Sequence, residues 1–180
     1  MAVCECIFLI QYTESSSTSC SLLYLGVRSF QFKINNNIYY TNQKLYRDKL
    51  CDTPLCHFCN QETETLLHIF VECRYVVELW GYVNVFITNV FNFPPLEVSE
   101  KVLGVHEKIS LPQFDAVNHL TILVKHFIHM CKYKNTEPSI PRLKEKIVDI
   151  ERIERMISIR KNKQDFHDQK WSLLLQHINV

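Results

Sequence analysis

Three cysteines and one histidine near the middle of the chain have the residue types and the spacing of a zinc site. They are Cys56, Cys59, His68 and Cys73, in the pattern C-x2-C-x8-H-x4-C. In structural sites Zn²⁺ takes four tetrahedral ligands, and closed Cys₃His sets are of this kind. Two cysteines separated by two residues can bind one ion from a single tight turn, so the second pair must come from another element. The sequence therefore predicts one structural Zn²⁺ held by these four side chains.

Two alternatives to this ligand set remain. Free cysteine is commonly buried as a small apolar residue, so the spacing can also arise from core residues alone. Cys51 and His57 are rival ligands close to the same turn. His57 lies inside the CxxC pair, where its backbone already serves the site, and we expect it not to bind the metal.

The remaining reactive residues do not form a catalytic set. His119, His126 and His129 fall on one side of a predicted helix, opposite its apolar residues. Without Cys or carboxylate partners we interpret them as a solvated or RNA-facing surface rather than as a second metal site. No two aspartates are adjacent, whereas polymerisation needs paired carboxylates for two metal ions. We predict that the chain is not an enzyme.

The elements that position the zinc ligands are predicted to be helices. The chain has only three glycines, and the tight turns of β-rich folds depend on glycine. Thr63 or Thr65 can cap a helix that carries His68. His68 and Cys73 are five positions apart, about 140° around an ideal helix, so we expect the helix to loosen or tighten between them. Helical spacing of apolar residues predicts three buried stripes: Val76, Trp80, Val83, Ile87 and Val90; Val117, Leu120, Val124, Phe127 and Cys131; and Leu143, Ile147, Ile150 and Ile157, with Trp171 as a further core anchor.

These signals predict a mainly α fold, with a small CCHC zinc knuckle joining short helices and a helical extension after it. Residues 1–26 match no element and are expected to be disordered and outside the domain. Residues 27–92 are predicted to be the zinc-binding knuckle domain with its flanking helices. Residues 93–111 are interpreted as a linker with a brief extended stretch at KVLGV, and residues 112–180 as the helical C-terminal extension.

Composition and charge bound the location and the partners. Lys and Arg total 20 and Asp and Glu total 19, without the basic excess of a stand-alone nucleic-acid binder. The first residues, MAVCECIFLIQY, have no basic residue before a short apolar run, unlike a signal peptide. No run approaches the ~18 apolar residues that would span a bilayer. We predict an intracellular protein, nuclear or cytoplasmic and not secreted, with reduced cysteines and no membrane partner.

The stretch SFQFKINNNIYYTNQKLYRDKLCDTPLCHFCNQETETLLHIFVECRYVVELW resembles the reverse-transcriptase zinc-binding region of LINE-type (non-LTR) retrotransposon polyproteins. The resemblance extends more weakly from about residue 27 to residue 171, through VLGV, LVKHFIHMCKYKN and a final charged helix. It implies a zinc-binding accessory module that helps to hold RNA or DNA, here as a fragment without polymerase or endonuclease parts. The matching residues are Thr41, Asn42, Leu45, Cys56, Phe58, Cys59, Glu64, Thr65, His68, Cys73 and Trp80.

The expected partners are RNA or DNA, and no small-molecule substrate is expected. Phe58 lies between the zinc cysteines, where its ring could stack on a base or pack against neighbouring leucines. Arg160, Lys161 and Lys163 form the densest basic cluster near the C-terminus and are candidate phosphate contacts, although acids interrupt this stretch and a solvated helix face is the default. The alternatives are a zinc-stapled interaction or scaffold module and a non-functional remnant of a retroelement.

Overall fold

All the regular elements in the part of the chain that the structure describes are helices. The computed structural model describes residues 18–105 and 112–178. The single β-bridge among these residues pairs Leu55 with Thr63. This confirms the prediction of a mainly α fold with a zinc knuckle between helices. The helices are α1 (Thr18–Asn35), α2 (Asn42–Arg47), the π-helical turn η1 (His68–Glu72), α3 (Arg74–Phe91), α4 (Val98–Leu103), α5 (Pro112–Tyr133), α6 (Ile140–Arg160) and α7 (Gln164–Ile178).

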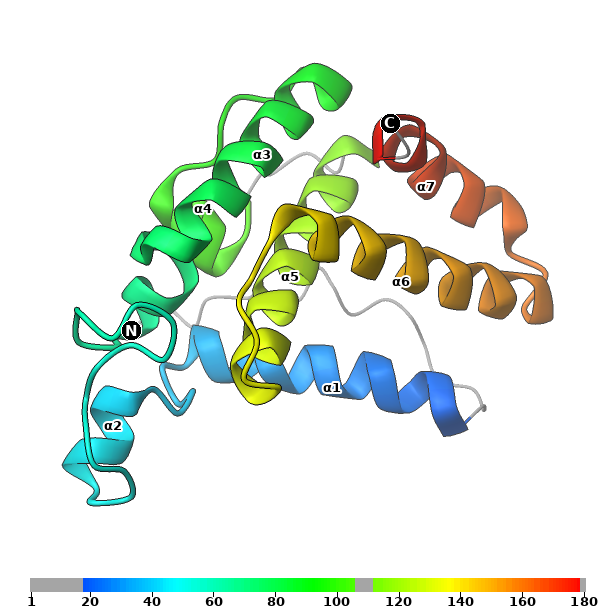
Figure 1. Cartoon of the computed structure of the whole chain (residues 1–180). Helices are drawn as coiled ribbons and strands as arrows, with labels where there is room; N and C mark the ends of the chain where they lie inside the picture. Colours follow the sequence, from blue (N-terminus) through cyan, green and yellow to red (C-terminus); the bar gives the residue numbers. More distant parts are fainter. Residues whose placement is uncertain (1–17, 106–111, 179–180) are drawn as a thin grey trace, which may run out of the picture.

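Helix α5 is the centre of the molecule. It contacts α1, α3, α6 and α7, while α6 and α7 form a hairpin beside it and α4 packs on η1 and α1 (Figure 1). Its buried residues are not confined to the predicted stripe, because Ile122, Leu123 and Ile128 are buried as well. A helix that is apolar on all sides is buried on all sides, so α5 is a core helix.

The predicted apolar stripes form the core. Every predicted stripe residue of α5 is buried, and so are Trp80 and Trp171, whose exposed fractions are 2% and 1%. Val90 and Ile157, at the ends of the stripes of α3 and α6, are only half-buried. The helical periodicity therefore identified the core faces correctly.

The interpretation of the α5 histidines as a solvated surface is wrong. The side chain of His119 is only 16% exposed, and its ring meets Trp171 edge-on at 5.5 Å between centroids. The ring of His129 stacks on Phe30 at 5.1 Å, and His126 meets the same phenylalanine edge-on at 5.6 Å. The side of α5 opposite its apolar stripe is covered by other helices, which periodicity within one helix cannot reveal.

Two segments differ from the predicted boundaries. Helix α1 begins at Thr18, so residues 18–26, expected to be disordered, are helical; residues 1–17 and 106–111 lie outside the described residues. The KVLGV stretch is not extended, because α4 covers Val98–Leu103. A capping box begins α4: the backbone N–H of Glu97 donates to Glu100 Oε2 at 2.8 Å, which satisfies a donor that the helix end would otherwise leave free.

No helix in the described part of the chain combines the length and the apolar character needed to cross a membrane.

Candidate metal centre

Cys56 and Cys59 project from one tight turn. The backbone N–H of Cys56 donates to the carbonyl of Glu62 at 2.7 Å, and the N–H of Asn60 donates to the carbonyl of Cys56 at 2.9 Å. Asn60 has a positive φ of 52°, a conformation that asparagine tolerates better than most residues. These bonds fold residues 54–64, hereafter the CxxC turn, so that both sulfurs point to the same side.

The second ligand pair comes from η1 and the residue that follows it. Thr65 Oγ1 accepts from the backbone N–H of His68 at 2.9 Å, which confirms the predicted threonine cap. The N–H of Cys73 donates to the carbonyl of His68, five residues earlier, at 2.8 Å. A π-turn has roughly 4.4 residues per turn, which reduces the angle between these positions from about 140° to about 50°. The expected loosening of the helix is confirmed, and it brings both ligands to one side.

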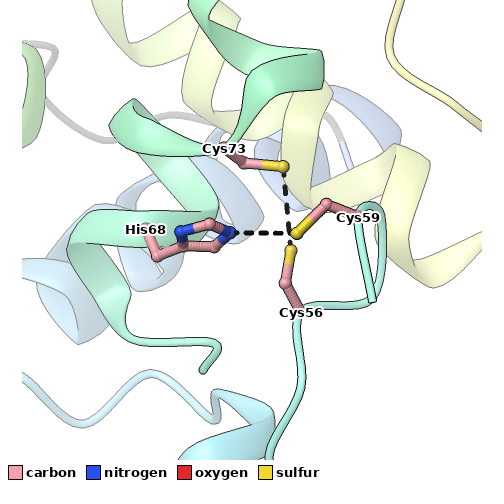
Figure 2. Close-up of side chains that lie close together, drawn as sticks. All are labelled: Cys56, Cys59, His68 and Cys73. Carbon is pink, nitrogen blue, oxygen red and sulfur yellow. Dashed lines mark hydrogen bonds between the residues drawn. The ribbon is translucent and has the colours of Figure 1, made fainter. Parts of the chain in front are cut away.

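The four ligand atoms converge on one point. All of them lie within 4.8 Å of one another. The sulfurs of Cys56 and Cys73 are 3.8 Å apart, and Cys59 Sγ is 3.4 Å from His68 Nε2 (Figure 2). Zinc bonds of about 2.3 Å to sulfur and about 2.0–2.1 Å to nitrogen, at tetrahedral angles, separate two sulfurs by about 3.8 Å and a sulfur from a nitrogen by about 3.6 Å. The donor set and its spacing therefore fit one tetrahedral Zn²⁺.

The site is closed to solvent, as a structural zinc site requires. Cys56 and Cys73 have no exposed surface, and Cys59 and His68 are 7% and 8% exposed. In the absence of metal, the hydrogen bond between the two buried thiols raises the pKa of Cys56 and lowers that of Cys73. Cys56, Cys59 and Cys73 would bind Zn²⁺ as thiolates, so metal binding would release their thiol protons.

The rival ligands do not join the cluster. Cys51 Sγ instead approaches the carbonyl of Thr53 at 3.2 Å. His57 contributes its backbone N–H, which donates to Glu64 Oε2 at 2.9 Å. Among the described residues, one group of His, Cys, Asp and Glu has metal-ligand geometry, and it contains the four predicted residues.

Glu64 has a role at the site that sequence reasoning missed. It has no exposed surface, and its Oε1 accepts from the backbone N–H of Asn42 at 2.8 Å and from Lys132 Nζ. The backbone N–H of His57 donates to Oε2 of the same side chain. The Glu64 carboxylate therefore connects the CxxC turn to α2 and α5 through hydrogen bonds. The available signal was the place of Glu64 within the zinc-binding motif, but its partners lie too far away in the sequence for the motif to identify them.

The predicted nucleic-acid contacts lie in two different environments. Phe58 is 8% exposed and meets the ring of His57 edge-on; this burial favours the packing alternative over stacking on a base. Arg160, Lys161 and Lys163 are exposed at the end of α6 and in the turn that follows it. The structure does not place the basic cluster beside the metal centre (Figure 1).

Within the described residues, fold and site together define a helical protein with one buried Cys₃His cluster that could hold a single structural Zn²⁺. Residues 20–80 match the family model described as zinc-binding in reverse transcriptase. The match begins inside α1 and ends at Trp80, so it covers all four ligands and the helices that hold them. The match supports the similarity of this stretch to reverse-transcriptase zinc-binding regions, as the resemblance implied. No curated protein matches the chain.

Proposed function

We propose that this chain is the zinc-binding accessory module of a non-LTR, LINE-type retrotransposon reverse transcriptase, that it acts inside the cell, and that it binds RNA or DNA without carrying out a reaction itself. One observation supports this most: a complete, buried, tetrahedral Cys₃His set lies within the stretch that matches the reverse-transcriptase zinc-binding family. The zinc ion has a structural role in this proposal, because all four of its positions are taken by protein ligands.

The metal centre itself is a poor anchor for phosphate. Three thiolates around Zn²⁺ leave a net negative charge, so cationic contacts must come from elsewhere. Arg160, Lys161 and Lys163 are exposed together at the end of α6, and we assign phosphate contacts to them. Binding through lysine and arginine releases counterions, so the affinity should fall steeply with salt and depend little on sequence.

The test is binding of the purified, zinc-loaded chain to a fluorescent RNA at two salt concentrations. Replacing Arg160, Lys161 and Lys163 with glutamine should weaken binding and flatten the salt slope by about 0.7 for each phosphate that is no longer neutralised on a single strand. The charge-preserving variant Lys161→Arg/Lys163→Arg is the control and should bind like the parent. Equal binding by the glutamine variant contradicts the assignment of phosphate contacts to this cluster.

Phe58→Ala separates the two roles of that ring. If Phe58 stacks on a base, the variant loses RNA affinity but keeps zinc and its salt slope. If the ring only packs, as its burial favours, the variant loses stability or zinc affinity instead. If the parent chain binds no nucleic acid even at low salt, this proposal is wrong and the alternative of a zinc-stapled scaffold module takes its place.

A further inference from the structure

The segment from the middle of α1 to the turn after α2 has a charge unlike that of the whole chain. Residues 28–50 contain five basic residues, Arg28, Lys33, Lys44, Arg47 and Lys49, and one acidic residue, Asp48. The complete chain has 20 basic residues and 19 acidic ones. Five basic residues and one acidic residue give this segment a net charge of +4, whereas the complete chain has a net charge of +1.

The same segment exposes aromatic rings. Tyr40 is 63% exposed and Tyr46 is 50% exposed, and α2 contains no buried residue. Helix α2 lies at one edge of the molecule, away from the α6–α7 hairpin (Figure 1). Exposed tyrosines beside arginine and lysine make a surface suited to single-stranded nucleic acid, because bases stack on the rings and phosphates meet the cations.

Hydrogen bonds hold this surface in a fixed position. Lys44 Nζ donates to Asn37 Oδ1 at 2.9 Å and to the carbonyl of Tyr39 at 3.1 Å, which fastens the turn carrying Tyr40 to α2. Asn42 donates its side-chain amide to the carbonyl of Leu55 at 2.8 Å. The buried carboxylate of Glu64 accepts the backbone N–H of Asn42 and that of His57. Helix α2 is thus mounted on the CxxC turn.

We propose that Tyr40, Tyr46, Arg47 and Lys49, hereafter the α2 face, bind a single-stranded nucleic acid, with the tyrosines stacking on bases and the cations contacting phosphates. The inference rests on the proposed function and names a surface for it. It supplies exposed rings where Phe58 is buried. The proposal also connects zinc binding to nucleic-acid binding, since a Zn²⁺ ion that orders the CxxC turn would also hold α2, which is hydrogen-bonded to that turn.

The first arm of the test isolates stacking. The probes are a fluorescent oligouridylate, the matching oligothymidylate and a duplex of equal length, each titrated with the zinc-loaded full chain. Tyr40→Ser/Tyr46→Ser should weaken binding to both single strands by about fivefold or more, with the salt slope unchanged. Tyr40→Phe/Tyr46→Phe keeps both rings and should stay within about twofold of the parent. The duplex should bind more weakly than either single strand, because its bases are already stacked.

The second arm uses two arginines in matched settings. Arg47 is paired with Asp48 and its side chain is 73% exposed, while Arg152 is paired with Asp149 and is 71% exposed. Arg47→Gln should weaken binding and reduce the salt slope by about 0.7. Arg152→Gln makes the same change in net charge on α6 and should leave both quantities at the parental values.

The outcomes separate the inference from the proposed function. Suppose that the parent chain binds. If the serine variants then bind equally well, or if Arg47→Gln and Arg152→Gln have equal effects, the α2 face is overturned while nucleic-acid binding stands. Duplex binding as strong as single-strand binding also overturns it. A parent chain that binds none of the probes overturns both proposals. Weaker binding only in the serine and Arg47 variants, with the phenylalanine variant unaffected, supports the α2 face.

Discussion

Glu64 is a single side chain on which three parts of the molecule depend. Its carboxylate has no exposed surface, and it accepts hydrogen bonds from α2, the CxxC turn and Lys132 of α5. Removing one partner of a buried ion pair leaves the other charge without compensation, which costs about 3–5 kcal/mol. Glu64→Ala should therefore lower the free energy of unfolding by that amount in urea titrations of the zinc-loaded protein. The exposed Glu62→Ala serves as control and should change it by less than about 0.5 kcal/mol.

Lys125 is a buried cation that donates to an uncharged acceptor. It has no exposed surface, its Nζ donates to the carbonyl of Val102 at 2.6 Å, and burial lowers its pKa from 10.5 to about 7. The unfolded chain keeps the proton up to pH 10.5 and the folded chain releases it near pH 7. The lowered pKa means that the folded state disfavours the charged form of Lys125, so the penalty on folding is largest below pH 7, where both states hold the proton. Between about pH 7 and 10.5 the unfolded chain binds more protons than the folded chain, so the free energy of unfolding rises with pH and the penalty disappears near pH 10.5.

Replacing Lys125 with methionine should therefore stabilise the protein at pH 7, by about 1–4 kcal/mol. The difference between variant and parent should shrink as the pH rises from 7 to 10. The carbonyl of Val102 keeps a second donor, because Gln31 Nε2 lies 3.3 Å from it. Urea unfolding of both proteins at several pH values measures the difference, and a difference that grows with pH would show that Lys125 is not the group responsible.

At the scale of the elements, the π-turn η1 is what allows a histidine and a cysteine five positions apart to bind one ion. A hydrogen bond from α3 supports the turn: Trp80 Nε1 donates to the carbonyl of Phe70 inside η1 at 2.6 Å, in a buried position. Wide turns of this kind are rare and occur mostly as single turns, and in this protein the indole N–H bonds to a carbonyl inside the turn. The supporting indole lies in the stretch that matches the zinc-binding family.

Trp80→Phe should weaken zinc binding, because it removes the N–H that holds η1. Phenylalanine keeps a large ring in the core, so the substitution tests mainly the hydrogen bond. Loss of a buried hydrogen bond costs about 1–3 kcal/mol, or about 5- to 150-fold if all of it appears as metal affinity. Competition with a chromophoric chelator measures the affinity. Trp171→Phe is the matched control, since its indole donates to Glu154 Oε2, away from the metal centre. It should lower the melting temperature without changing zinc affinity.

At the scale of the whole molecule, the zinc site holds together a part of the chain that contains little helix. Residues 48–65 contain no α-helix and are held by the CxxC turn and Glu64. The α5–α7 helices pack through Trp171, Leu143 and Leu174, which are almost fully buried. The metal should therefore matter most to the region that matches the family, and less to the C-terminal helices.

Chelation should remove about one zinc per chain and speed amide exchange in residues 51–80 before it does so in α5–α7, because metal binding and local folding are coupled. Cys59→Ser should behave like the chelated protein. Metal analysis and hydrogen exchange by mass spectrometry test this. A metal-free Cys59→Ser protein with parental exchange rates and melting temperature would contradict the structural role of the ion.

The ligand set, the helical class and the core faces could be predicted from the amino-acid sequence because each depends on local spacing. Cys56 and Cys59 lie in one turn, and the angle between His68 and Cys73 alone required a distorted helix. The stripes of α3, α5 and α6 follow from a period of 3.6 residues. None of these conclusions needs a contact between distant parts of the chain.

Only the tertiary structure decided what covers each surface. The α5 histidines are polar and on the side opposite the apolar stripe, yet the rings of Phe30 and Trp171 contact them and leave them half-buried. Phe58 is enclosed, while Tyr40 and Tyr46 remain exposed although they too are aromatic. Glu64 and Lys132 are 68 positions apart. Burial and long-range pairing depend on which helices meet, and that is a property of the packed molecule rather than of any one segment.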